Sequence, residues 1–320
     1  MLKYILRRLL HMIPVIFIIS VLIFGIIKMA PGDPVGSRLD PKATAEQKAA
    51  ERARLGLDKP IPVQYFNWLR RSVKGDFGDS YMYKQPVSKV VPGFIKNSFI
   101  LNIVTYFLAF AISIPIGIVC AVKQYSTTDN FWTVFSIIGI SMPSFFFGLL
   151  LIYIFSVKLN MFPINGMITP GKNAIGLARA KDIIYHMVLP AVVLTFGSMA
   201  SLIRYTRTSM LEVINQDYIR TARSKGLTEK IVIYKHAFRN ALIPIVTIVG
   251  FSIPGLFSGA VILERIFVWP GIGNVMMDAI SARDYNMMMA LNMFFALLTL
   301  LGNLLADIGY ALVDPRIKVD

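Results

Sequence analysis

The sequence has little of what most enzymes use for chemistry, because its 320 residues include one cysteine and three histidines. The lone cysteine, Cys120, excludes an internal disulfide and a cysteine-based metal cluster. His11, His186 and His236 do not stand at metal-ligand spacing with acidic neighbours, so we expect no hydrolytic metal site. No pair of nucleophile and base stands out either. We therefore expect no catalytic residue, no metal and no cofactor in this chain.

Charge is scarce as well. Only 16% of the residues are charged, against about a quarter in soluble domains, and 55% are hydrophobic. A formal net charge of +15 would suit a nucleic-acid-binding protein, but the basic residues here fall between apolar runs instead of covering a soluble fold. The composition therefore indicates a protein embedded in the lipid bilayer, with no nucleic-acid partner.

Six apolar segments are long enough to cross a bilayer, which requires about 20 apolar residues per helix. They lie at about 9–29, 99–122, 133–157, 184–203, 241–263 and 287–311. The first begins like a signal peptide, but its apolar stretch is too long and no small-residue cleavage site follows, so we expect a retained span. The pattern predicts an all-α polytopic membrane protein with six transmembrane helices.

Orientation follows from Lys and Arg in short loops, which gather on the cytoplasmic side. The most basic connecting segment is 204–240, and placing it inside puts both termini inside too. We therefore expect cytoplasmic N- and C-termini and a long first extracytoplasmic loop. The expected organisation is a first helix with this loop at 1–94, a five-helix core at 95–312 and a cytoplasmic tail at 313–320.

The long loop carries its own helix signals. ATAEQKAAERARLGLD reads as a short helix that ends near Gly56, and KPIPVQYFNWLRR reads as an amphipathic segment started by proline. GDFGDS then supplies a turn. We expect two short helices and a turn outside the membrane.

Ionisable residues are rare within the spans. Lys28 stands near the end of the first span and Asp307 near the end of the sixth, whereas an ion-driven carrier would place charges deeper. The energy for any transport is therefore expected to come from elsewhere. Asn102, Ser141 and Ser252 are candidates for substrate passage, although such side chains in a span also serve as hydrogen bonds between helices.

The stretch GMITPGKN, residues 166–173, nearly matches a phosphate-binding loop, in which glycines, a lysine and a final hydroxyl residue hold a nucleotide. Asn173 replaces the hydroxyl residue, no strand precedes the stretch, and the expected orientation places it outside. We do not expect a nucleotide site here.

The most informative segment is DYIRTARSKGLTEKIVIYKHAFRNALIP, residues 217–244, a basic stretch between two apolar spans. Asp217 would cap a short helix over 218–225, and Gly226 would end that helix in a left-handed conformation. Thr228 would start a second helix that continues into the fifth span.

The short helix would place Tyr218, Ile219 and Ala222 on one face, with basic residues elsewhere. A small helix with an apolar face and a basic rim fits a groove in a soluble partner. The alternative is that the basic loop only fixes topology and touches anionic headgroups. Both interpretations remain open from the residues, although a helix, a glycine break and a second helix are more structure than topology requires.

ARSKGL followed by KHAFRNALIP resembles the cytoplasmic coupling loop of permeases in binding-protein-dependent ABC importers, in the form found in the peptide and nickel subfamily. Arg220 stands where the general importer pattern has glutamate, and the final Leu-Pro of that pattern is missing. Further segments resemble this family in the same order: RRLLHMIPV with APGDP, LGLDKPIPVQYFNWL, GDFGDS, ERIFVWPGIGNVMMDAISARDY and ADIGYALVDPRI.

The resemblance implies a type I ABC importer (MetI-like) permease fold in the cytoplasmic, or inner, membrane of a bacterium or archaeon. Two homologous permease subunits, usually distinct, would form the pathway. Two ATPase subunits would hold ATP and Mg²⁺ and engage the coupling loops, and an extracytoplasmic solute-binding protein would deliver the substrate. By matching position, the expected ATPase contacts are Tyr218, Arg220, Thr221, Ala222, Lys225 and Gly226.

The expected function is therefore that of a permease subunit, not an enzyme, which forms half of a pathway for dipeptides or oligopeptides driven by ATP hydrolysis on partner subunits. Nickel chelates and sugars are alternative substrates within the same family. Outside it, an ion-coupled carrier or channel predicts uptake that is indifferent to ATP, and a scaffold or membrane enzyme predicts no solute movement.

Overall fold

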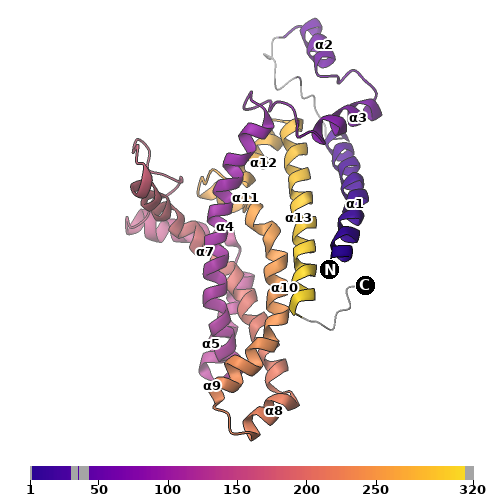
Figure 1. Ribbon diagram of the computed structural model, residues 1–320. Coiled ribbons are helices and arrows are strands. Elements are labelled where there is room, and N and C mark those ends of the chain that lie inside the picture. Colours follow the sequence, from indigo (N-terminus) through magenta and orange to yellow (C-terminus); the bar gives the residue numbers. More distant parts are fainter. Residues whose placement is uncertain (1, 30–34, 36–42, 314–320) are drawn as a thin grey trace. The chain divides into compact units, whose positions relative to one another are not determined.

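The computed structural model describes residues 2–29, 35 and 43–313, so the expected tail at 313–320 lies almost wholly outside the described residues. All the named elements of the described part are helices, and that part contains no strand (Figure 1). The elements are α1 (Leu2–Met29), α2 (Ala45–Arg54), α3 (Ile61–Ser72), α4 (Val87–Val122), α5 (Thr127–Ser141), α6 (Ser144–Leu151), η1 (Ile152–Lys158), α7 (Gly176–Ile214), α8 (Asp217–Ser224), α9 (Glu229–Ile231), η2 (Val232–Ala237), α10 (Phe238–Phe257), α11 (Val261–Ile266), α12 (Ile272–Ser281) and α13 (Tyr285–Val313). The segments η1 and η2 are π-helical.

Five stretches of the described chain are long and apolar enough to cross a membrane, and a bent helix pair raises the number to six if it counts as one span. The six predicted spans each coincide with one of these. The third, predicted over 133–157, is not one continuous helix. The chain bends by 101° between α5 and the helix that follows it. Pro143 lacks an N–H group and forces Met142 into an extended conformation with ψ 121°, which stops α5.

The chain divides into two compact units. The first contains Met1–Ser98, Phe257–Val261 and Pro270–Leu301, and the second contains Phe99–Leu256, Ile262–Trp269 and Gly302–Asp320. Because each unit draws on separated parts of the sequence, the long helices α4 and α13 contribute residues to both.

In the first unit, α3 packs where α1 ends, as the cluster of their apolar residues shows. Tyr65 and Trp68 on α3 are buried against Phe24 and Ile27 on α1, together with methionines from α13. The Tyr65 hydroxyl also shares a 2.7 Å hydrogen bond with Ser20. The predicted amphipathic segment is confirmed, and its buried aromatic face fixes the long loop to the first and last spans.

The loop helices form as the local signals predict. Thr44 and Gln47 make a capping box at the start of α2, where each side chain bonds the backbone of the other residue. Gly56 follows the helix at φ +68°, a conformation that glycine adopts without steric cost. Pro60 and Pro62 begin α3. Local capping chemistry is therefore sufficient to set these two helices.

Asp284 joins two distant parts of the first unit. Its buried carboxylate accepts hydrogen bonds from the Ser80 hydroxyl and from the backbone N–H groups of Met82 and Met287. Met287 lies in the first turn of α13, so the same carboxylate caps this helix. The turn GDFGDS is thereby held against the start of the sixth span.

In the second unit, α4 and α5 pack closely on α7 through small residues. A side chain at Gly117 would place its Cβ atom 2.6 Å from Cβ of Thr206, and one at Gly139 would lie 2.8 Å from Cβ of Ala200. Neither distance is tolerable, so the two glycines are required for this approach. Small residues at helix contacts are typical of membrane bundles, in which close packing replaces the hydrophobic effect.

Candidate coupling segment

The basic segment after α7 folds as a short helix, a glycine turn and a second helix. Helix α8 begins at Asp217 and ends at Ser224, and Gly226 follows at φ +75°, which confirms the predicted left-handed end. Thr228 precedes α9 in an extended conformation and so begins the second helix as predicted. One detail is wrong. Asp217 lies in the first turn of α8, and Gln216 occupies the cap position without a side-chain cap bond.

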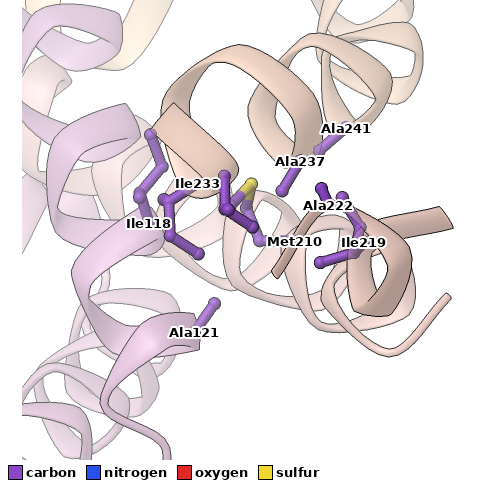
Figure 2. Close-up of a cluster of buried hydrophobic side chains, with 9 residues drawn as sticks. Ile118, Ala121, Met210, Ile219, Ala222, Ile233, Ala237 and Ala241 are labelled. Atoms are coloured by element: carbon purple, nitrogen blue, oxygen red, sulfur yellow. The ribbon is translucent and has the colours of Figure 1, made fainter. Parts of the chain in front are cut away.

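The apolar face of α8 is covered by the chain itself (Figure 2). Ile219 is fully buried and Ala222 is 7% exposed. Both belong to one cluster with Met210 of α7 and with apolar residues of η2 and α10, including Ile233 and Ala237. The prediction that Ala222 contacts a partner is therefore not supported for its side chain, since a helix of this length needs an apolar anchor to stay folded and Ala222 is part of that anchor.

The opposite face of α8 is open to solvent. Five of the six predicted contact residues are exposed, namely Tyr218, Arg220, Thr221, Lys225 and Gly226. The prediction that Tyr218 shares the apolar face of Ile219 and Ala222 is wrong, because Tyr218 is 46% exposed and is not part of the cluster that buries those two residues. The Thr221 hydroxyl donates to the backbone carbonyl of Asp217 one turn earlier, so its methyl group and the neighbouring basic side chains form the outer surface.

An ion pair closes the turn between α8 and α9. The Arg223 guanidinium donates two hydrogen bonds to the carboxylate of Glu229, at 3.2 Å from Nε and 2.8 Å from one terminal nitrogen. These bonds lower the pKa of Glu229 and raise the pKa of Arg223. This pair was not predicted from the sequence, although opposite charges on the two sides of a glycine turn indicate such a pair.

The helix that leads into α8 is fixed to α5 by a second, more buried ion pair. Arg207 of α7 donates to both carboxylate oxygens of Asp129, at 2.6 and 2.8 Å. The Asp129 side chain is 2% exposed and also accepts the backbone N–H of Tyr125 at 2.9 Å. This pair lies one helical turn before Met210, which packs on α8, so α7 joins the α8 anchor to the α5 side of the bundle.

The three candidates for substrate passage are not brought together by any described contact. The Asn102 amide donates to the backbone carbonyls of Gly255 and Leu256 on α10, at 3.0 and 3.2 Å. The Ser252 hydroxyl donates to the backbone carbonyl of Ile248 within its own helix at 2.7 Å. Ser141 is exposed at the end of α5. Asn102 therefore forms hydrogen bonds between helices α4 and α10. A role in substrate passage stays a prediction for Asn102 and for the two serines.

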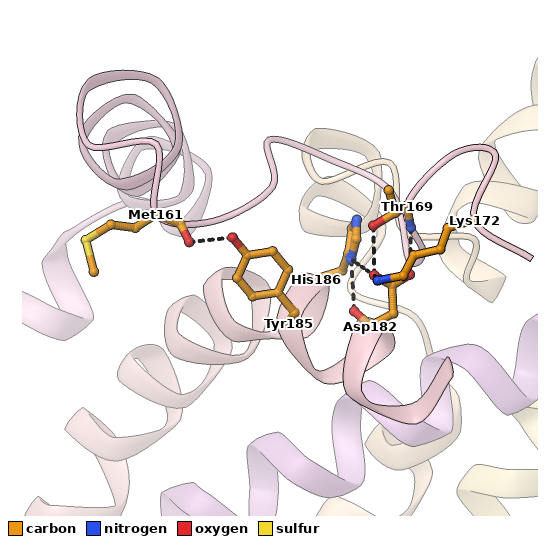
Figure 3. A network of polar contacts seen from close by, with 6 residues as sticks. All are labelled: Met161, Thr169, Lys172, Asp182, Tyr185 and His186. Carbon is orange, nitrogen blue, oxygen red and sulfur yellow. Dashed lines mark hydrogen bonds and ion pairs between the residues drawn. The ribbon is translucent and has the colours of Figure 1, made fainter. Parts of the chain in front are cut away.

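The stretch that nearly matches a phosphate-binding loop is tied to α7 (Figure 3). The buried Asp182 carboxylate accepts the backbone N–H of Thr169 at 2.8 Å and its hydroxyl at 2.7 Å, and lies 3.8 Å from the Lys172 ammonium. Tyr185 donates to the backbone carbonyl of Met161 at 2.7 Å. The polar groups of the loop thus hold it on the helix, and the absence of a nucleotide site stays a prediction.

Comparison with known proteins agrees with this architecture. Residues 113–319 match the family model "Binding-protein-dependent transport system inner membrane component", and residues 1–91 match the model of its N-terminal part. The chain is 45% identical over 319 residues to the oligopeptide transport system permease protein AppB of Bacillus subtilis, covering 99% of this chain and 100% of that protein. It is 36% identical over 318 residues to the glutathione transport system permease protein GsiC of Salmonella typhimurium, with 99% of each covered.

Among solved structures, a chain of the MetNI methionine ABC transporter in an inward-facing conformation aligns with a TM-score of 0.52 at 17% identity, covering 70% of this chain and 96% of that one. This likeness shows that the helices are arranged in the same fold. Together with the family models over both parts of the sequence, it shows that the chain belongs to the family of inner membrane components of binding-protein-dependent transport systems, and is a multi-pass permease subunit with a MetI-like fold.

Proposed function

We propose that this chain forms half of a peptide pathway across the cytoplasmic membrane, paired with a second homologous permease. An external solute-binding protein would deliver dipeptides or oligopeptides. Two ATPase subunits would bind ATP and Mg²⁺ and supply the energy. The similarity to an oligopeptide permease over the full length of both chains supports the peptide substrate over nickel chelates or sugars.

The observation that supports the coupling role is the two-sided nature of α8. Ile219 and Ala222 anchor it to α7 and η2, while Tyr218, Arg220 and Lys225 stay on the outer surface. A rigid helix with a free outer face can enter a groove of a partner and transmit its displacement. The Arg223–Glu229 pair links α8 to α9 across the turn, so that the two helices would move together.

The proposed orientation has both termini and α8 in the cytoplasm, because positive charge in short loops gathers on that side. Closure of the ATPase dimer would then displace α8, and α7 would carry the displacement into the bundle. The expected result is an exchange between inward- and outward-facing arrangements. This mechanism requires no nucleotide site in the permease itself.

The test is uptake by the complete complex reconstituted in liposomes with its external binding protein. We expect a labelled peptide to accumulate only when hydrolysable ATP is present on the side of α8, and to do so after an ionophore has collapsed ion gradients. A nickel chelate and a sugar should fail to compete. Uptake that follows an ion gradient and ignores ATP would show an ion-coupled carrier instead.

A further inference from the structure

The first unit contains a cavity of about 510 Å³ next to the end of α1. That volume is within the range of small-molecule sites, roughly 300–1,000 Å³. Its lining comes from α1, α2, α3, the loop after α3 and the first turns of α13. The six cationic residues that line it are Lys28, Arg54, Lys59, Arg70, Arg71 and Lys74. No aspartate or glutamate lines it among the residues that the structure describes, so its field attracts anions.

Most of this positive charge is not neutralised locally. Within the described chain, Arg54 is paired with a carboxylate, that of Glu51, whereas no ion pair engages Arg70, Arg71 or Lys74. Lys28 faces aromatic rings, at 5.5 Å from the centroid of Phe24 and 5.6 Å from that of Tyr285. Clustered cations repel one another, and a bound anion would reduce that repulsion.

The cavity also contains an uncharged polar side chain that suits an oxyanion. Asn67 lines it and is exposed, so the N–H groups of its amide can donate to a ligand there. Trp68 also lines the cavity but is 4% exposed, and it contributes apolar ring surface. A ligand that offers several acceptor oxygens, as phosphate does, would use the Asn67 amide together with the cationic residues.

The position of the cavity points to the source of the phosphate. It lies beside the last two turns of α1, whose outward residues Leu22, Ile26 and Met29 are 57, 67 and 84% exposed. Apolar side chains this exposed on a membrane span face lipid, and the span ends at Met29, so the cavity is at the depth of the headgroups. Phe24 and Met289 add apolar surface within it, against which an acyl chain or a glycerol backbone can lie.

From these observations we propose that the cavity between α1, α2 and α3 is a binding site for a phosphate oxyanion, in the form of the headgroup of an anionic phospholipid. Arg70, Arg71 and Lys28 hold the charge, and the aromatic wall of Phe24 and Trp68 receives the apolar part of the lipid. The bound lipid would fasten the long loop to the membrane surface. The site is separate from the coupling segment and does not depend on which substrate is carried.

The experiment compares the intact transporter complex with a complex carrying Arg70→Gln and Arg71→Gln. Both arginines are exposed, so the fold should survive. The matched control removes two exposed cations elsewhere, Arg179→Gln and Lys181→Gln. Native mass spectrometry would count phosphatidylglycerol and phosphatidylcholine retained by each complex. We expect selective retention of phosphatidylglycerol, weakened roughly 25-fold in the Arg70 and Arg71 variant, because each surface cation contributes about fivefold, and unchanged in the control.

A second arm distinguishes the two sources of phosphate. The delipidated complex is titrated with inorganic phosphate, and its thermal unfolding is followed. Stabilisation by inorganic phosphate that disappears in the Arg70 and Arg71 variant, without selective lipid retention, would keep the oxyanion site and assign it to the free ion. Equal retention of both lipids by all three complexes, together with no phosphate effect, would overturn the proposal.

Discussion

Arg207 and Asp129, which stand 78 residues apart in the sequence, form a two-pronged ion pair with distances of 2.6 and 2.8 Å. The same geometry recurs between Arg223 and Glu229, but there the side chains are 40 and 56% exposed, against 23 and 2% for Arg207 and Asp129. Burial distinguishes the two pairs, because water screens the first much less than the second.

We therefore expect Asp129→Asn to destabilise the protein by up to about 3–5 kcal/mol, since it leaves the largely buried Arg207 guanidinium without its charge partner. Glu229→Gln should cost less than about 1 kcal/mol. Thermal unfolding of the purified complex measures both. If the double variant Asp129→Asn with Arg207→Gln is no more stable than the sum of the single changes predicts, the two residues are not coupled.

The two faces of α8 should respond differently to substitution. Ile219→Ala removes a fully buried side chain and should lower stability by about 2–5 kcal/mol. Arg220→Glu with Lys225→Glu changes exposed residues, so stability should stay within about 1 kcal/mol while ATP-driven uptake falls at least about tenfold.

The matched control for this charge reversal is Arg179→Glu with Lys181→Glu, which reverses two exposed charges on another segment. Uptake and ATP hydrolysis should both persist there. Normal uptake by the Arg220 and Lys225 variant would contradict the assignment of this surface to the ATPase.

Gly226 gives a third prediction. Its φ of +75° suits glycine, and a side chain there would meet no atom within 4 Å, so the cost of Gly226→Ala is conformational only. We expect about 1–2 kcal/mol of destabilisation. Gly226→Pro should do more harm, since proline is fixed near φ −65° and cannot adopt this conformation. Gly197→Ala is the control, because it also has open space but lies within a helix. Thermal unfolding should show the largest loss of stability for Gly226→Pro, a smaller loss for Gly226→Ala and the smallest for Gly197→Ala.

Asp284 gives a fourth. Asp284→Ala removes the cap of α13 and leaves the donors of Ser80 and Met82 unsatisfied, at a cost of about 2–4 kcal/mol. The turn at 75–82 should then become sensitive to protease in the folded complex. Asp76→Ala, which removes one exposed hydrogen bond to Gly78, should not have this effect. Equal protease sensitivity in the two variants would contradict the role given to Asp284.

Local signals predicted much of this structure. Proline and glycine positions were enough to place α2, α3 and the end of α8, because these residues restrict or release the backbone regardless of tertiary context. The apolar runs located the spans for the same reason, as lipid requires about 20 apolar residues wherever the chain crosses.

What the sequence could not predict is which surfaces meet. Helical periodicity showed that Ile219 and Ala222 share a face, but it could not show that α7 and η2 cover that face before any partner does. Likewise, Asp129 and Arg207 are single charged residues beside apolar runs, and nothing in their spacing pairs them. The bend of 101° beside Pro143 was not predicted either, because an apolar run with a proline does not show how sharply the chain turns there.

The burial of Ile219 and Ala222 divides the short helix into positions with separate duties. The identity of the inward residues is constrained by packing within this chain, whereas the outward residues are constrained only by what the helix contacts. A change of partner would therefore require substitutions at the exposed positions and none at the buried ones. The exposed positions are Tyr218, Arg220, Thr221 and Lys225. Under the proposed coupling role, α8 is an exchangeable connector: grafting these outward residues from a related permease should redirect this chain to the ATPase of that permease while its membrane core stays unchanged.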